Sequence, residues 1–147
     1  MRRPSFVSIC SALAVVALCA TSLGAQAREA IGTPSPMLSQ AIRVGNMVYP
    51  SGQLPTRGAN ADTTIEGQTR STLENVKRVL EMAGTTIDNA VKCTVFIIDG
   101  ADFAGMNAVY RTFWTGAPPA RTTVVVKALV VPGAKLEIEC NAVMPAR

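Results

Sequence analysis

The chain has 147 residues, of which 48% are hydrophobic and 16% charged, and it contains no histidine. This length predicts one domain, and the apolar content excludes an intrinsically disordered protein. The lack of histidine excludes a histidine-dependent catalytic triad or zinc site, because both require an imidazole.

Residues 1–27 have the features of a secretory signal peptide. Arg2 and Arg3 form a positive amino-terminal region, residues 7–20 are apolar and uncharged, and residues 25–27 show the small-x-small pattern of a cleavage site. The apolar run is shorter than the about 20 residues of a membrane-spanning helix. We therefore expect cleavage near residue 27 and a periplasmic or secreted protein without a stable membrane anchor. Cleavage would leave 12 basic and 10 acidic side chains, and this mild balance gives no case for a nucleic-acid partner.

Two cysteines, Cys93 and Cys140, would remain in the mature domain, which spans residues 28–147. They lack the Cys-x-x-Cys spacing of a metal site, so no metal is expected. An oxidising compartment permits a disulfide between them. The alternative is a pair of small buried hydrophobic side chains, and the sequence leaves this choice open.

The mature domain begins with an extended lead-in over residues 28–37, followed by a hairpin. Two short strands are predicted over residues 39–44 and 47–50, and the Gly45-Asn46 pair between them is typical of a tight turn. Ser51-Gly52 comes directly after the hairpin. A glycine there lets the backbone approach a ligand closely, although an ordinary turn glycine is the commoner case.

A helix that runs from residue 63 to Met82 is the clearest element in the sequence. Thr63-x-x-Glu66 is typical of a capping box, and Gly84 is the expected stop. The apolar residues recur at helical spacing, which predicts a stripe that covers one face of a sheet. The stripe consists of Leu73, Val76, Leu80 and Ala83.

The next predicted elements are a strand over residues 91–98 and a second helix. The strand alternates and is rich in β-branched residues. Asp102 is expected to cap the helix, which ends at Trp114. Its apolar stripe is formed by Phe103, Met106, Tyr110 and Phe113. Asn107 lies within that stripe, where an amide requires either a structural hydrogen bond or a ligand.

The last two strands are predicted over residues 121–128 and 136–143, and they carry the candidate chemistry. Arg121 follows a stiff Pro-Pro-Ala and starts a β-branched run, and its planar guanidinium matches a carboxylate. The final strand carries Glu137 and Glu139. An immobile arginine near a carboxylate can hold one end of a small anionic substrate while the other end reacts. The alternative is an ordinary solvated arginine at a strand edge.

The order of these elements is hairpin, helix, strand, helix, strand, strand. This order predicts a two-layer α+β domain in which a mixed β-sheet carries two helices on one face. The other face would be uncovered, and its β-branched strands favour association with further subunits.

Seven short segments together resemble the Rid (reactive intermediate deaminase) family, and the resemblance covers essentially the whole mature chain. Each segment is weak by itself, but their order and spacing are specific. They are Gly45-Asn46, Ser51-Gly52-Gln53-Leu54-Pro55, Thr72-Leu73-Glu74-Asn75-Val76, Lys92-x-Thr94-Val95-Phe96, Asp102-Phe103-x-x-Met106-Asn107-x-x-Tyr110, Pro119-Ala120-Arg121 and Leu136-Glu137-Ile138-Glu139.

The resemblance implies a chorismate-mutase-like fold, a homotrimer, and ligand sites between neighbouring subunits. It also implies hydrolysis of 2-imino and 2-enamino acids, such as 2-aminoacrylate and 2-iminobutyrate, to 2-keto acids and ammonia, without a cofactor. The expected partners are therefore small imino or keto acids and further copies of the chain.

Family roles carry over to the matching positions of this sequence. Arg121 matches the carboxylate-binding arginine, and Glu137 matches the glutamate that positions or activates the attacking water, with Glu139 the less favoured base. The remaining substrate-binding positions are matched by Ser51, Gly52, Asn107, Thr122 and Thr123.

Two positions depart from the family pattern. Leu38 stands where the family has a pocket tyrosine, and Thr123 stands where the type enzymes have a cysteine. Neither removes the arginine that binds the carboxylate, but both leave open a non-catalytic small-molecule-binding or holdase-like trimer. Ribonuclease or translation-inhibiting activity, known for some relatives, is disfavoured by the mature charge of +2 and the lack of histidine.

Overall fold

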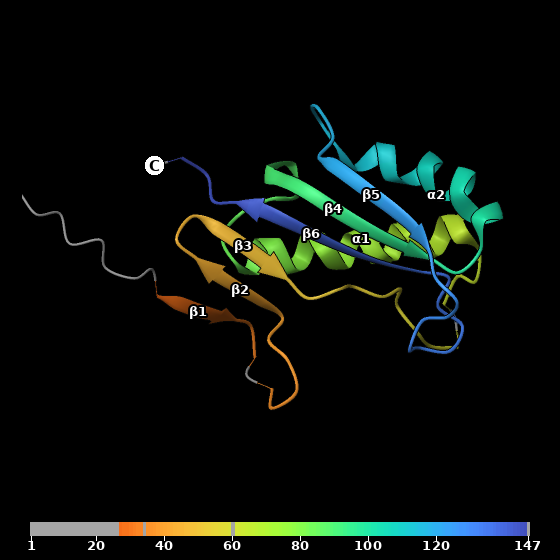
Figure 1. Cartoon of the computed structure of the whole chain (residues 1–147), viewed down its shortest axis with the longest axis horizontal. Coiled ribbons are helices and arrows are strands. Elements are labelled where there is room, and N and C mark those ends of the chain that lie inside the picture. Colours follow the sequence, from red (N-terminus) through yellow and green to blue (C-terminus); the bar gives the residue numbers. More distant parts are fainter. Residues whose placement is uncertain (1–26, 34, 60, 147) are drawn as a thin grey trace, which may run out of the picture.

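The fold is a six-stranded mixed sheet with its helices on one side (Figure 1). The computed structural model describes residues 27–33, 35–59 and 61–146. The predicted signal peptide lies outside the described residues except for Ala27, so its cleavage stays a prediction. Within the described ranges, no helix has the length and apolar character needed to cross a membrane.

The sheet has the strand order β1-β2-β3-β6-β4-β5. All neighbouring strands pair antiparallel except β4 and β5, which are parallel and joined through the second helix. The strands are β1 Arg28–Ile31, β2 Ala41–Val44, β3 Met47–Pro50, β4 Ala90–Ile97, β5 Ala120–Val125 and β6 Leu136–Val143. The helices are α1 Ile65–Met82 and α2 Phe103–Tyr110, with 3-10 turns η1 Ile87–Asn89, η2 Gly100–Asp102 and η3 Arg111–Phe113.

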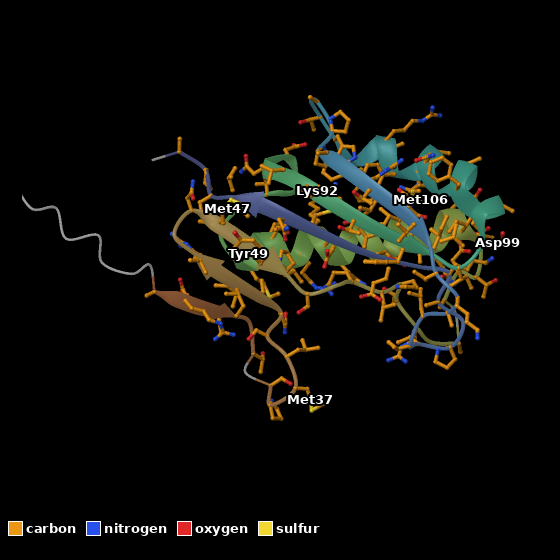
Figure 2. All side chains as sticks on the ribbon, in the orientation of Figure 1. Met37, Met47, Tyr49, Lys92, Asp99 and Met106 are labelled. Carbon is orange, nitrogen blue, oxygen red and sulfur yellow. A yellow bond between two sulfur atoms is a disulfide. The ribbon has the colours of Figure 1, made fainter. Side chains whose placement is uncertain are left out.

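Both helices share one hydrophobic core with the sheet, which confirms the predicted two-layer α+β fold. Leu73 of α1, Met106 of α2 and Ile138 of β6 are completely buried in the same cluster. Alternate residues along β6, beginning with Leu136, are buried. The opposite face has no helix over it: Tyr49 and Lys92 project there (Figure 2), and the Tyr49 side chain is 44% exposed.

The structure corrects the predicted lead-in and the ends of three strands. Part of the lead-in is strand β1, which pairs antiparallel with β2; its residues are mostly exposed, so it has no alternating pattern to detect. Strand β2 begins at Ala41, two residues after the predicted start. Strand β4 begins and ends one residue earlier than predicted, and its register with β6 shifts between Ala90 and Lys92, which leaves Val91 42% exposed. Strand β5 ends at Val125, since its partner β4 ends at Ile97.

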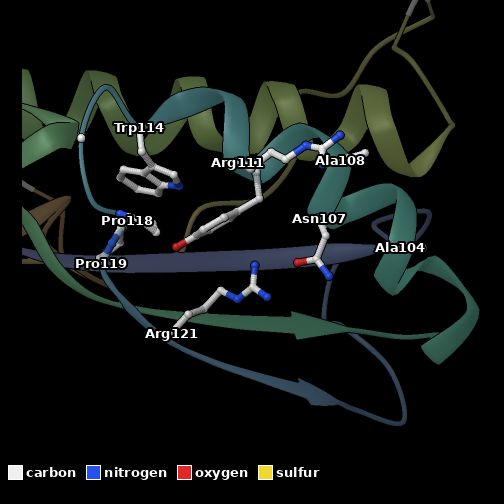
Figure 3. A pocket seen from close by; sticks show the side chains of 10 residues that line it. Ala104, Asn107, Ala108, Arg111, Trp114, Pro118, Pro119 and Arg121 are labelled. Carbon is white, nitrogen blue, oxygen red and sulfur yellow. The ribbon is translucent and has the colours of Figure 1, made fainter.

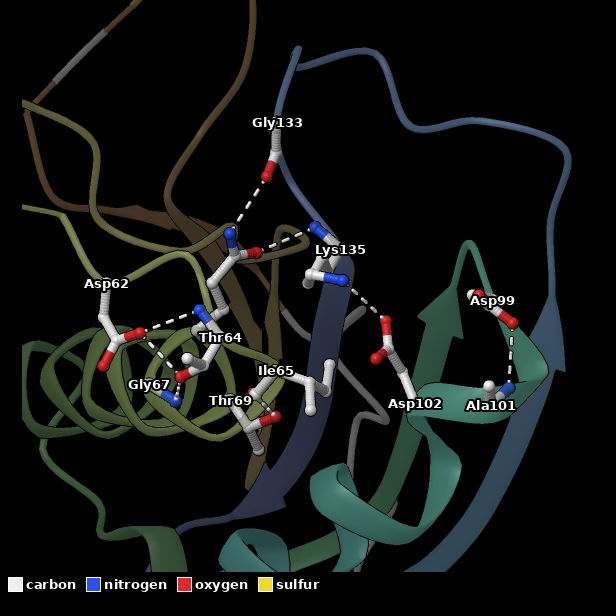
Figure 4. A network of polar contacts seen from close by, with 11 residues as sticks. Asp62, Thr64, Ile65, Gly67, Thr69, Asp99, Ala101, Asp102, Gly133 and Lys135 are labelled. Atoms are coloured by element: carbon white, nitrogen blue, oxygen red, sulfur yellow. Dashed lines mark hydrogen bonds and ion pairs between the residues drawn. The ribbon is translucent and has the colours of Figure 1, made fainter.

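The predicted capping box of the first helix is wrong by one residue. Thr64, not Thr63, caps α1, and its hydroxyl accepts a hydrogen bond from the Gly67 amide at 3.1 Å. The Asp62 carboxylate fixes this cap by accepting from the amide and hydroxyl of Thr64 at 2.8 and 2.6 Å (Figure 4). The predicted end is confirmed: α1 stops at Met82, and Gly84 has a φ of 85°.

The second helix also differs from its prediction. Its α-helical part is only Phe103–Tyr110, and the chain continues as η3. The Asp102 side chain makes no capping bond; it accepts from Lys135 Nζ at 3.1 Å (Figure 4). Phe103, expected in the apolar stripe, is the first residue of α2 and is 43% exposed.

Cys93 of β4 and Cys140 of β6 form a disulfide. They are directly opposed in the antiparallel pair, and both are completely buried. The sequence left open whether these cysteines form a disulfide or are small buried side chains, and in the structure they are both. The bond joins the central strands of the sheet.

We expect the double variant Cys93→Ala/Cys140→Ala to have a free energy of unfolding lower by about 4 kcal/mol, because the disulfide closes a sequence separation of 47 residues in the unfolded chain. Denaturant unfolding with and without a reductant measures this difference. The reductant should lower the midpoint of the wild type and leave that of the double variant unchanged. Equal stability of the two proteins in oxidising buffer would contradict the prediction.

Candidate active site

Arg121 lies on the edge strand β5 with its side chain beneath α2. Its partner across the sheet is Cys93, which is completely buried, so both side chains point to the helix-covered face. The guanidinium carbon lies 4.6 Å from the ring centre of Tyr110 and 5.7 Å from that of Phe103, and Nη1 approaches Met106 Sδ at 3.9 Å. These cation–π contacts hold the guanidinium in one place.

The guanidinium of Arg121 has no carboxylate partner in the part of the chain that the structure describes. The salt bridge found there joins Lys135 to Asp102. A half-buried guanidinium flanked by aromatic rings can bind an anion without first breaking an ion pair. Its fork of N–H donors suits a carboxylate in particular.

A cavity of about 670 Å³ opens beside Arg121, between α2, η3 and the loop that leads into β5. Figure 3 shows the Asn107 amide and the Arg121 guanidinium extending toward each other from α2 and β5. Asn107 therefore faces the candidate anion site rather than a loop, as a ligand contact requires. Thr123 lies two residues along β5 on the same face, and its buried hydroxyl has no hydrogen-bond partner among the described residues.

Glu137 lies on the opposite face of the sheet. Its neighbours Leu136 and Ile138 are completely buried under the helices, so the residue between them points to the uncovered face. Gly52 packs directly against its carboxylate: a Cβ at position 52 would collide with the Glu137 oxygen and lie 2.9 Å from Cδ. A side chain at position 52 would displace the Glu137 carboxylate, so glycine lets the carboxylate keep its place against the backbone.

Backbone bonds hold the segment that carries Gly52 against β6. Gln53 and Ile138 exchange two backbone hydrogen bonds of 2.8 and 3.0 Å. The Ser51 hydroxyl donates to the Ser39 carbonyl at 2.7 Å, and the Ser51 amide donates to the Gln40 carbonyl at 2.9 Å. Ser51 therefore fixes the position of the segment, while its hydroxyl oxygen remains able to accept.

The environment of Glu137 raises the pKa of its carboxyl. Burial is the larger cause, and the negative charge of Glu139 adds to it. Strand β6 is regular, so the two glutamates share one face. A carboxylate with a raised pKa is a stronger general base for water near neutral pH.

The predicted site residues thus fall into two groups separated by the sheet. Thr122 belongs to the uncovered face, where its hydroxyl accepts from Lys92 Nζ at 2.6 Å. One chain cannot bring Arg121 and Glu137 to the same small molecule, because the sheet lies between them. The helix side carries Arg121, Asn107 and Thr123, and the other group comprises Ser51, Gly52, Thr122 and Glu137.

The surroundings of Arg121 differ from those that the sequence predicts. Helical spacing predicts that Phe103, Met106 and Tyr110 form an apolar stripe, whereas in the structure all three contact the guanidinium. The available signal was the presence of two aromatic residues seven positions apart on either side of Asn107. Within the described ranges, no cluster of three or more His, Cys, Asp or Glu side chains could hold a metal ion.

Comparisons with known proteins match nearly the whole described chain. A family model described as Endoribonuclease L-PSP matches residues 28–144. Protein DfrA of Myxococcus xanthus is 42% identical over 123 residues, which cover 80% of this chain and 90% of that protein. The chloroplastic Reactive Intermediate Deaminase A of Arabidopsis thaliana is 38% identical over 109 residues, which cover 72% of this chain and 58% of that protein.

Solved structures match the fold. The Rid-family protein YyfA of Yersinia pestis is 38% identical with a TM-score of 0.74, over 80% of this chain and all of that chain. A YjgF-family protein of Neisseria meningitidis is 26% identical with a TM-score of 0.76, over 84% of this chain and all of that chain. The family match, the relatives and the shared fold together show that this chain belongs to the Rid (YjgF) family.

Proposed function

We propose that the protein hydrolyses 2-imino and 2-enamino acids to 2-keto acids and ammonia, at sites formed between copies of the chain in a homotrimer. The observation that carries the proposal is that Arg121 and Glu137 lie on opposite faces of the sheet. Aromatic rings hold the Arg121 guanidinium, and burial raises the pKa of the Glu137 carboxyl. The relative named Reactive Intermediate Deaminase supports the reaction class. The uncovered sheet face supports assembly, since Tyr49 and Val124 are 44% and 38% exposed there.

In this proposal Arg121 of one copy binds the substrate carboxylate, and Asn107 orients the substrate. Glu137 of a neighbouring copy removes a proton from water as the water oxygen bonds to the carbon of the protonated imine. The electron pair of the C=N bond moves to nitrogen and gives a carbinolamine. Glu137 then gives its proton to nitrogen, the C–N bond breaks with its electron pair leaving on ammonia, and Glu137 takes the hydroxyl proton as the C=O bond forms. Positioning and general base catalysis suffice, because the protonated imine is already electrophilic.

We expect Arg121→Ala and Glu137→Gln each to abolish hydrolysis, and a mixture of the two variants to recover part of it. In Arg121→Ala, loss of the charge-assisted contact weakens carboxylate binding by about tenfold to a hundredfold, and loss of the fixed orientation lowers the rate of the bound substrate further. In mixed assemblies some sites pair an intact Arg121 with an intact Glu137. The measurement is the lifetime of freshly generated 2-iminobutyrate after the two chains are refolded together.

A matched control is Arg121→Ala refolded with the double variant Arg121→Ala/Glu137→Gln, which should show no recovery because no intact arginine is present. If the wild type is active but the two variants do not complement each other, Arg121 and Glu137 act in a site formed by one chain. A wild type that leaves the lifetime of 2-iminobutyrate unchanged would overturn the deaminase. Binding of 2-keto acids without turnover would then favour the non-catalytic trimer.

The raised pKa of Glu137 gives Glu137→Gln an expected effect on stability. The folded state binds this proton more tightly than the unfolded state, so the ionised carboxylate lowers stability as pH rises above the unfolded pKa of about 4.3. The Gln variant should therefore be more stable than the wild type at pH 7, and the gain should disappear at lower pH. Denaturant unfolding at pH 4 and pH 7 measures both differences. A variant that is less stable by the same margin at both pH values would refute the expectation.

We also propose that the protein is exported and that residues 1–27 are removed. The charge and apolar pattern of those residues and the buried Cys93–Cys140 disulfide support an oxidising compartment. An amine- or amino-acid-oxidising enzyme in that compartment would supply the imines. The intact mass of protein from a periplasmic fraction should match residues 28–147 less two hydrogens. Full-length protein confined to the cytoplasm would contradict export.

The family model is described as an endoribonuclease, but we do not propose ribonuclease activity for this chain. The sequence contains no histidine, and its expected mature form has 12 basic and 10 acidic side chains. Neither feature favours binding to a polyanion such as RNA.

A further inference from the structure

We propose that the cavity beside Arg121 is a side-chain subsite that selects 2-imino acids with an aromatic side chain, and that Trp114 is its principal wall. This inference rests on the proposed function and names the substrate class of the same site. The carboxylate would bind Arg121, and the ring would pack against Trp114.

The arrangement of the cavity places an aromatic wall within reach of the anion site. Figure 3 shows Trp114 and Pro118 at one end and the guanidinium of Arg121 with Asn107 at the other. The Trp114 ring centre lies 5.1 Å from that of Tyr110, and the two planes are tilted by 53°. A ligand held by Arg121 therefore meets a corner of two aromatic rings, a geometry that favours a further ring.

The size of the cavity also favours a bulky side chain. Its volume of about 670 Å³ lies in the range of pockets for small organic molecules, whereas 2-iminobutyrate offers only an ethyl group. The lining residues Ala104, Ala108 and Gly116 have small or absent side chains. None of the three fills the cavity with a large side chain.

Two hydrogen-bond donors at the aromatic corner lack partners. The Tyr110 hydroxyl and the Trp114 ring nitrogen are buried, and neither meets an acceptor in the part of the chain that the structure describes. Burial raises the pKa of Tyr110 to about 12, so its hydroxyl remains a donor at neutral pH. Because both atoms are buried, they belong to the wall behind the cavity and do not reach its surface.

The charges around the cavity disfavour a charged side chain on the substrate. No acidic side chain is among the described residues that line it, so nothing there would balance a basic side chain. Arg111 lines the cavity, but Figure 3 shows its guanidinium turned away from Arg121. Only the Arg121 guanidinium therefore faces the ligand among the residues that line the cavity. One positive charge suits a ligand that has one carboxylate and an uncharged ring.

The test compares the binding of two stable carboxylates, butanoate and 3-phenylpropanoate, by calorimetry. We expect the phenyl compound to bind about tenfold more tightly, because its ring is buried against the cavity wall. Trp114 is the single tryptophan of the chain, so its fluorescence should change with the phenyl compound at the concentrations that saturate the heat signal.

Trp114→Ala should reduce the ratio of the two affinities to near one, and Trp114→Phe should largely keep it. Ala108→Leu fills the cavity from α2 and should lower the ratio even if Trp114→Ala fails to fold. The matched control is Phe103→Ala. It removes a ring that contacts Arg121 from outside the cavity, so both affinities should change alike.

Equal affinities for the two carboxylates in the wild type would overturn the subsite. An unchanged ratio in both Trp114→Ala and Ala108→Leu would overturn it as well. Binding is measured without turnover, so the subsite and the proposed reaction can fail separately. A phenyl preference without hydrolysis would leave the subsite standing, and hydrolysis of 2-iminobutyrate without that preference would remove the subsite alone.

Discussion

Successive residues of a β-strand point to opposite faces of the sheet, and the candidate site depends on this constraint. Cys93 stands between Arg121 on one side and Cys140 on the other, all on the helix-covered face. Glu137 is an odd number of positions from Cys140, so it must point the other way. The disulfide joins two of these strands at directly opposed residues. It therefore opposes the one-residue slip that would carry Glu137 to the face of Arg121.

Separation by the sheet keeps both charged groups available. An arginine and a glutamate on the same face of one chain would form an ion pair and satisfy each other. Here the aromatic rings of Phe103 and Tyr110 support the guanidinium, while burial and Glu139 raise the pKa of Glu137. Each group is held in surroundings that favour a further partner. The proposed assembly of several chains would let a substrate and a water serve as those partners.

Periodicity in the sequence predicted the elements whose side chains alternate between core and surface. The bounds of β3 and β6 and the end of α1 agree with the structure. Strand β1 was missed because its pairing uses the backbone, and an exposed edge leaves no pattern in the side chains. The opposition of Arg121 and Glu137 depends on the register of three strands, which no local pattern contains. Tyr110 and Trp114 are four residues apart, so their contact is local, but the position of Tyr110 over Arg121 depends on how α2 packs on β5. An apolar stripe looks alike in the sequence whether it covers a core or a guanidinium.

The sheet that separates Arg121 from Glu137 makes the proposed chemistry dependent on concentration. In the proposed assembly a lone chain would hold one half of each site, so dilution below the point of dissociation would abolish activity. Activity would then rise more steeply than the amount of protein until the chains are fully assembled. For an exported protein, this dependence would confine hydrolysis to a compartment that retains and concentrates the chains.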